Sequence, residues 1–148
     1  MSLKGQRTKS DFLEWERFQL LIHQLGRDNE YRFQLLIAIG CYTGLRISDI
    51  LKLRWEDLLS GRIEIKEQKT GKLRCIELNH QLKEVIQNTY QNQPETALVF
   101  VNRYGTKSIS VQYVNKRLKQ LFDHYGIKGN YSSHFMRKTL GRRVWNQN

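Results

Sequence analysis

Residues 43–53 read Thr-Gly-Leu-Arg-Ile-Ser-Asp-Ile-Leu-Lys-Leu, and this stretch decides more about the chain than any other. The Thr-Gly pair ends an apolar helical segment and a short helix follows, so Arg46 stands at the start of that short helix. The macrodipole at a helix start favours anions rather than cations. Asp49 follows three residues later and can lie on the same side to hold the guanidinium. A residue that breaks a local rule often marks a functional site. Taken alone, a structural Arg–Asp pair explains the pattern slightly better.

A second group of polar residues lies near the C-terminus, on a helix expected to begin at residue 132 or 133. His134, Arg137, Lys138 and Gly141 share one face of this helix because they are three or four residues apart. Arginine offers a planar pair of donors to phosphate oxygens, and histidine transfers protons near neutral pH. Glycine inside a helix costs about 1 kcal/mol relative to alanine, so the close approach of another group would explain Gly141. A basic surface helix remains the alternative.

Between these two stretches the sequence predicts an antiparallel β-hairpin. Residues 62–68 and 72–78 are β-patterned, with isoleucines alternating against charged residues in the first of them. The three residues between them form the expected turn, which places Lys69 at the tip of the hairpin. Lysines in turns are usually only solvated, and Lys66 and Lys72 lie close enough to compete for any role.

The rest of the chain is expected to be helical for the most part. Asp11 and Glu14 form a plausible capping box for a first helix, which Gly26 closes. The next helix, residues 29–42, is apolar nearly all round and should be buried at the centre. Further elements are expected as a helix at 80–91, a short strand at 97–101 and a helix from 110. The predicted fold class is mainly α with a small antiparallel β-hairpin.

The charge of the chain favours a polyanionic partner. The 148 residues carry a formal net charge of +11, and from Val101 onward Asp123 is the only acidic residue. Such an excess of Lys and Arg is typical of nucleic-acid-binding proteins. It does not separate DNA from RNA, and a solvated basic face without a partner has the same composition.

Several kinds of chemistry leave no trace in the sequence. There is no P-loop, no glycine-rich dinucleotide motif, no zinc-ligand spacing and no acidic cluster for a two-metal nuclease. Cys41 and Cys75 lie in expected apolar elements, so both are predicted to be reduced core residues. No apolar run approaches the ~20 residues of a membrane span. We therefore expect no cofactor, no metal, no small-molecule substrate and no membrane association.

Residues 43–53, continued by Trp-Glu-Asp-Leu at 55–58, resemble the first conserved box of the tyrosine recombinases, the phage-integrase family. In that box Thr-Gly-Leu-Arg precedes an acid and Leu-x-x-Leu. Residues 134–139, His-Phe-Met-Arg-Lys-Thr, resemble the second box, His-x-x-Arg-x-Thr. Residues 68–72, Gln-Lys-Thr-Gly-Lys, are similar to the family's β-hairpin with its catalytic lysine. Order and spacing agree from about Ser10 to the C-terminus, although the family more often has Glu at the position of Asp49.

The resemblance implies a mechanism. Members of the family attack a DNA phosphodiester with a tyrosine hydroxyl, which gives a 3′-phosphotyrosine and a free 5′-hydroxyl without any cofactor. By resemblance, Arg46 and Arg137 clamp the non-bridging oxygens and stabilise the pentacoordinate transition state. Lys69 protonates the leaving 5′-oxygen, and His134 assists proton transfer at the tyrosine. Asp49 is expected to stand behind Arg46 and orient it.

The chain departs from the family pattern after Arg137. In the family a further His or Trp and then the nucleophilic Tyr follow this arginine, whereas all seven tyrosines of this chain precede it. The resemblance therefore implies a partial catalytic domain over residues 10–148, with its C-terminal part missing. Residues 1–9 are expected to be a disordered or artificial extension. Strand cleavage is not expected unless a tyrosine arrives from outside the chain.

The expected partner is double-stranded DNA, in the cytoplasm with the nucleoid, and the full-length parent should act as a homo-tetramer on DNA. Further DNA contacts are expected from basic residues on the last two helices, namely Lys116, Lys119, Lys138, Arg142 and Arg143. Two other functions stay open. One is a non-catalytic DNA-binding module that keeps the phosphate clamp, and the other is an RNA-binding protein, against which the first box argues.

Overall fold

A computed structural model describes residues 10–147, and the expected extension at 1–9 lies outside this range. The structure is mainly helical with one two-stranded antiparallel sheet, which confirms the predicted fold class. The elements in chain order are α1 (Trp15–Arg27), α2 (Tyr31–Thr43), α3 (Ile47–Ile50), α4 (Trp55–Leu59), β1 (Arg62–Lys66), β2 (Leu73–Glu77), α5 (His80–Thr89), α6 (Val111–His124) and α7 (Phe135–Gln147).

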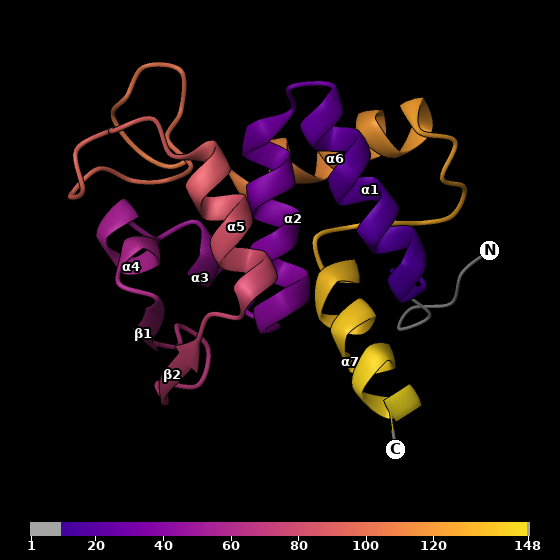
Figure 1. Cartoon of the computed structure of the whole chain (residues 1–148), viewed down its shortest axis with the longest axis horizontal. Coiled ribbons are helices and arrows are strands. Elements are labelled where there is room, and N and C mark those ends of the chain that lie inside the picture. The colour runs from indigo at the N-terminus through magenta and orange to yellow at the C-terminus, as the bar shows by residue number, and fades with distance from the viewer. Residues whose placement is uncertain (1–9, 148) are drawn as a thin grey trace, which may run out of the picture.

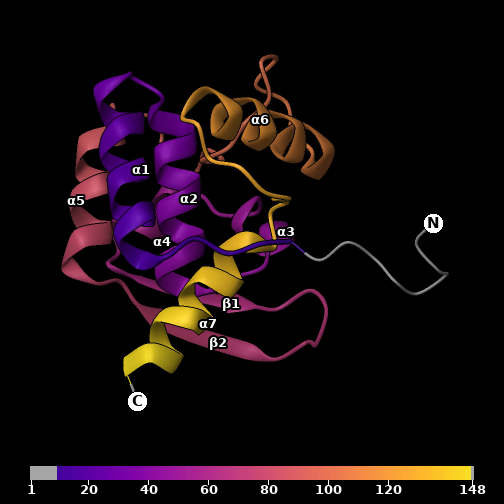
Figure 2. The ribbon, with the colours of Figure 1, turned by 90° about the vertical axis from the view of Figure 1, so that its right-hand side faces the viewer.

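Helix α2 lies at the centre of the structure, as its apolar sequence predicts. It packs against α1, α5 and α7 (Figures 1 and 2), and Leu36, Ile37 and Ile39 on it are fully buried. The close packing of α2 and α7 depends on Gly40. A Cβ built on Gly40 would overlap the side chain of Met136, so only a residue without a side chain allows this contact.

The hairpin lies beside α4 at one end of the helical layer (Figure 1). Ile63 pairs with Ile76, and Ile65 pairs with Arg74. Paired residues on an antiparallel ladder point to the same face, so Arg74 shares a face with these isoleucines. Ile63 is fully buried on that face. The strands are β1 and β2 as predicted, each shorter than expected by one or two residues at its ends.

The segment before α1 packs against the C-terminal part of the chain, and this changes one predicted cap. Leu13 donates its backbone N–H to Thr139 Oγ1 at 3.0 Å. The Asp11 carboxylate accepts the backbone N–H of Asn130 at 2.7 Å. Glu14 is the residue that flanks α1, and its side chain makes no capping hydrogen bond. The predicted capping box is therefore wrong, because tertiary contact engages Asp11 elsewhere.

Two further predictions are wrong, and one element is absent from the predictions. Residues 97–101 form no strand, only isolated bridges from Leu98 to Arg54 and from Val101 to Ser108. The short helix α4 was not predicted. Cys41 is buried as expected, but Cys75 is exposed, and its Sγ accepts a hydrogen bond from Arg62 Nε at 2.8 Å. Cys75 lies on the outer face of the hairpin, which the strand pattern alone did not distinguish.

Candidate functional site

Arg46 lies directly before α3, and a carboxylate from the hairpin holds its guanidinium. Arg46 Nη1 donates to Glu67 Oε2 at 2.9 Å. Glu67 follows β1 at the base of the turn, and its side chain is only 9% exposed, whereas that of Arg46 is 25% exposed. A partly buried, charge-assisted pair of this kind restricts the rotamers of the arginine and leaves its other N–H groups free for a ligand. The residue that holds Arg46 is thus Glu67 and not, as the spacing suggested, Asp49.

Asp49 has a different set of contacts. Its Oδ1 accepts the backbone N–H of Gln68 at 3.2 Å and lies 3.4 Å from Lys52 Nζ. The carboxylate is buried, and Oδ2 has no hydrogen-bond partner among the described residues. Asp49 therefore ties α3 to the residue next to Lys69. Together with the Glu67–Arg46 ion pair, this bond fastens the base of the hairpin turn to the start of α3.

Helix α7 brings Arg137 to the same region. Burial lowers the pKa of Arg137, and the positive charge of Arg46 lowers this pKa further, as does that of Arg74, while Glu67 raises it. Contacts of Arg74 connect the two arginines, because Arg74 lines the same hollow as Arg137 and approaches the same Glu67 oxygen as Arg46. The structure thus brings Arg46 and Arg137, which lie far apart in the chain, to one region.

An open hollow of roughly 410 Å³ lies beside Arg137. Its lining comes from the end of α2, from β2 and from α7, namely Thr43, Gly44, Arg74, Arg137, Leu140, Gly141, Val144 and Trp145. No described atom outside the local helix lies within 4 Å of a Cβ built on Gly141. The glycine therefore leaves space in the hollow, and nothing within the described chain occupies it.

Within the described part of the chain, neither Lys69 nor His134 makes a hydrogen bond or an ion pair with Arg46 or Arg137. Lys69 is exposed in the turn between β1 and β2, and its side chain has no hydrogen bond or ion pair within residues 10–147. His134 is exposed directly before α7, and its backbone N–H donates to Ser132 Oγ at 3.4 Å. Their side chains are therefore free to contact a ligand, and their predicted roles in proton transfer stay predictions.

The cations expected to bind DNA fall into two groups. Lys138 Nζ donates to the backbone carbonyl of Ser10 at 2.6 Å. The guanidiniums of Arg142 and Arg143 lie over the rings of Phe12 and Trp15, at 5.1 and 5.2 Å from the ring centroids. These three cations thus contact the N-terminal segment.

Lys116 and Lys119 form the second group. Both are exposed on α6, and the described chain provides no ion pair for either. They are therefore the cations of the predicted set whose charged groups are most available to solvent and to a polyanion.

Two residues of the site were not singled out from the sequence. Glu67 and Arg74 were assigned to the hairpin strands without a role. The strand alternation contained a signal, because Glu67 continues the series Ile63, Ile65 on the inward face. A carboxylate at an inward position needs a cationic partner when it is buried. Arg74, which pairs with Ile65 across the ladder, was the cation on the same face.

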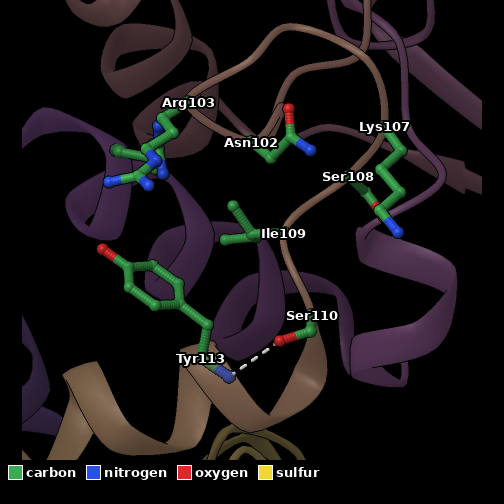
Figure 3. Close-up of a pocket in the computed structure, with 8 residues that line it drawn as sticks. Asn102, Arg103, Lys107, Ser108, Ile109, Ser110 and Tyr113 are labelled. Carbon is green, nitrogen blue, oxygen red and sulfur yellow. Dashed lines mark hydrogen bonds between the residues drawn. The ribbon is translucent and has the colours of Figure 1, made fainter.

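Figure 3 shows a second hollow, of about 580 Å³, at the opposite end of α2. Arg32 in the first turn of α2 lines it, and Arg103 and Lys107 reach it from opposite sides. Ser110 accepts the backbone N–H of Tyr113 at 3.0 Å and caps α6 beside it. Arg32 and Thr43, which line the two hollows, lie about 16 Å apart along α2. The basic hollow therefore does not belong to the arginine pair.

No group of three or more His, Cys, Asp or Glu residues in the described part of the chain is placed to hold a metal ion. No helix within residues 10–147 is long and apolar enough to cross a membrane.

Comparison with known proteins places these features in a family. The family model described as "Phage integrase family" matches residues 11–148. Tyrosine recombinase XerC of Lactobacillus delbrueckii subsp. bulgaricus is 24% identical over 155 residues, which cover 97% of this chain and 52% of XerC. The chain thus spans about half the length of this curated relative.

Solved structures show the same fold. The crystal structure of XerA recombinase superimposes with a TM-score of 0.76 at 17% identity, covering 97% of this chain and 53% of XerA. The Tn1549 transposon integrase, in complex with circular intermediate DNA, gives a TM-score of 0.72 at 18% identity and covers 99% of this chain and 56% of the integrase. The fold described above is therefore that of tyrosine recombinase catalytic domains.

Proposed function

This chain belongs to the phage integrase family, and on that premise we propose that it forms the phosphate-binding part of a site-specific recombinase active site on double-stranded DNA. The observation that carries the proposal is the convergence of Arg46 and Arg137 from different elements, linked by the contacts of Arg74 with Glu67 and with the hollow beside Arg137. Two partly exposed guanidiniums in one environment favour a doubly coordinated anion, and a phosphodiester offers two non-bridging oxygens in the matching geometry.

The proposed chemistry is that of the family, carried over to the residues that match its motifs. A tyrosine hydroxyl attacks the phosphorus, the phosphorus–5′-oxygen bond breaks, and a 3′-phosphotyrosine forms. Arg46 and Arg137 neutralise the additional negative charge of the pentacoordinate transition state. Lys69, on the exposed turn, donates a proton to the leaving 5′-oxygen, and His134 assists proton transfer at the tyrosine. The reverse attack by a 5′-hydroxyl rejoins a strand, so no nucleotide or metal cofactor is required.

The nucleophile is proposed to come from outside residues 1–148. Each of the seven tyrosines lies within the described part of the chain, and none of them lines the hollow beside Arg137. A tyrosine on another segment or another chain would find there an open space next to the clamp. In the full-length protein we expect a homo-tetramer on DNA, located in the cytoplasm with the nucleoid.

Binding of this chain to duplex DNA tests the clamp directly. Fluorescence anisotropy with a labelled duplex, repeated over a range of salt concentrations, gives the number of phosphates contacted. We expect affinity to fall steeply with salt, and Arg46→Ala and Arg137→Ala each to lower the salt dependence. A DNA affinity that does not change with salt concentration would exclude a phosphate clamp at this site. Arginine variants that bind DNA as tightly as the unaltered chain, with the same salt dependence, would exclude it as well.

The natural reading frame separates the recombinase from a non-catalytic DNA-binding module. A continuation past Asn148 that contains His or Trp and then Tyr within a few tens of residues supports cleavage. In that longer protein, a nicked DNA substrate should trap a covalent adduct, and Arg46→Ala or Arg137→Ala should slow its formation by about 10²–10³-fold. A stop codon after Asn148, combined with salt-dependent binding, leaves the module as the function.

A further inference from the structure

A third arginine, Arg74 of β2, lies in the same site as Arg46 and Arg137. Arg74 Nη1 is 3.7 Å from Glu67 Oε2, the same oxygen that accepts the N–H of Arg46. Arg74 Nη2 donates to the backbone carbonyl of Thr43 at 3.4 Å. Both contacts are long, so the guanidinium is positioned without being saturated. Its side chain is 33% exposed, slightly more than that of Arg46.

The charges of the site do not balance. The single carboxylate of Glu67 pairs with two guanidiniums, at 2.9 Å from Arg46 Nη1 and at 3.7 Å from Arg74 Nη1. The second distance is long for an ion pair. Arg137 has no carboxylate partner among the hydrogen bonds and ion pairs of the described chain. Asp49, the other buried acid nearby, is already 3.4 Å from Lys52 Nζ. Arg46 and Arg74, both partly buried, share one carboxylate, and the exposed Arg137 adds a third positive charge beside them. This excess of positive charge is one that an anion would offset.

The position of Arg74 indicates where that anion binds. Arg74 and Arg137 line the same hollow, and the space between them is open. We propose that Arg74 is a further phosphate-binding residue, which contacts a non-bridging oxygen of DNA within this hollow. The assignment rests on the proposed function, in that it requires the site to bind DNA.

Glu67 has a defined part in this arrangement. Its Oε2 accepts the hydrogen bond from Arg46 Nη1 and lies 3.7 Å from Arg74 Nη1. Thr70 Oγ1 donates to its other oxygen, Oε1, at 3.4 Å. The negative charge of Glu67 therefore offsets part of the positive charge that a phosphate would meet at these guanidiniums. A purely structural role for Arg74, as a fastener between β2 and the end of α2, makes a different prediction. In that case the removal of either partner, Glu67 or Arg74, would have effects of the same sign.

The test uses the same anisotropy titration of this chain with a labelled duplex. Affinity falls with salt, and 'the slope' here means the absolute slope of log affinity against log salt concentration. Arg74→Gln should lower this slope by about 0.9, the contribution of one phosphate contact, as Arg137→Gln should. Arg62→Gln is the matched control, because Arg62 lies on the same hairpin, is 52% exposed and pairs with Glu64 on the outer face. It should leave the slope unchanged. Glu67→Gln should raise affinity at fixed salt, because the negative charge beside the guanidiniums is lost while a hydrogen-bond acceptor remains.

The outcomes are separable. If the unaltered chain shows no salt-dependent binding, the proposed function fails and the Arg74 assignment fails with it. If Arg137→Gln lowers the slope and Arg74→Gln does not, the assignment of Arg74 alone is wrong. Loss of affinity in both Glu67→Gln and Arg74→Gln would show a structural fastener instead. Arg74→Lys guards against misfolding, because it keeps the charge and should keep the slope, and a slope as low as that of Arg74→Gln would also contradict the proposal.

Discussion

Glu67 Oε2 accepts a hydrogen bond from Arg46 Nη1 at 2.9 Å and so joins the base of the hairpin turn to the residue that precedes α3. This bond links two parts of the chain that the proposed reaction needs side by side. Arg46 is the proposed phosphate ligand, and the turn that begins beside Glu67 carries Lys69. A second bond, from the backbone N–H of Gln68 to Asp49 Oδ1, joins the same two segments. The placement of the turn lysine relative to the arginine therefore depends on two buried carboxylates.

The buried carboxylate of Glu67 should be worth more to stability than an exposed one on the same hairpin. Glu67→Ala leaves the partly buried Arg46 without its acceptor, so we expect the free energy of unfolding to fall by about 1–2 kcal/mol. Glu64→Ala, which removes an exposed partner of Arg62, should cost about 0–1 kcal/mol. Urea denaturation measures both. Equal losses in the two variants would mean that the Glu67 pair is no stronger than a surface pair.

Alanine substitutions at two helical glycines should change the stability of the fold in opposite directions. Gly40→Ala pushes a methyl group into Met136, and overpacking of this kind costs about 1–3 kcal/mol. Gly141→Ala meets open space in α7 and should instead stabilise the fold by about 0.5–1 kcal/mol, through helix propensity. Thermal unfolding of both variants decides the matter. Stabilisation by Gly40→Ala would contradict the close packing of α2 against α7.

The stability of the fold should depend on pH through Asp28 and Tyr125. Hydrogen bonds from Arg27 and from the Tyr125 hydroxyl lower the pKa of Asp28 to about 2, from 3.8. The folded state therefore binds fewer protons than the unfolded state in this range, and stability is lost as the pH falls from about 4 towards 2. Tyr125→Phe removes one of the two donors and should make this acid loss smaller.

The same pair acts in the opposite direction at high pH. Burial and the hydrogen bond to Asp28 raise the pKa of Tyr125 to about 12, from 10.0. The folded state keeps the phenolic proton longer than the unfolded state, so stability is lost as the pH rises from about 10 to 12. Chemical denaturation across both ranges measures the effect, with the exposed Tyr104→Phe as control. Identical pH profiles for Tyr125→Phe and the unaltered chain would exclude this linkage.

The cations predicted to bind DNA should separate into those that support the fold and those that do not. Arg143→Gln removes a cation from the ring of Trp15 and should lower stability by about 0.5–1 kcal/mol. Lys119→Gln changes no recorded ion pair in the described chain, so stability should stay the same while the salt dependence of DNA binding falls. Denaturation and anisotropy on the same two variants test this division. A loss of stability in Lys119→Gln but not in Arg143→Gln would contradict this division.

Parts of the candidate site could be predicted from local spacing and from resemblance. The isolation of Arg46 at a helix start and the His134–Arg137 face of α7 are both visible in a single stretch of sequence. That the two arginines belong to one site came from the resemblance, since no local pattern connects residues so far apart. The structure supports this, because Arg74 shares a hollow with Arg137 and a Glu67 oxygen with Arg46.

Other parts were not accessible from the sequence. Spacing on a single helix suggested Asp49 as the partner of Arg46, because it was the nearest acid in the chain. The structure selects Glu67, since the hairpin folds back over α3 and brings a buried carboxylate closer. The same kind of tertiary contact takes Asp11 from the predicted cap to Asn130. It also places the guanidiniums of Arg142 and Arg143, which stay exposed, over aromatic rings.

The sequence by itself determined the helical class, the hairpin with Lys69 in its turn, and the central position of α2. Each of these follows from periodicity and turn chemistry, which act between residues a few positions apart. Only the tertiary structure decided which carboxylate holds Arg46, that Arg74 joins Arg46 and Arg137, and which cations remain free. These choices depend on how α2, α7 and the hairpin pack together. Burial is what makes them decisive, because a charge removed from water must find whichever partner the packing provides.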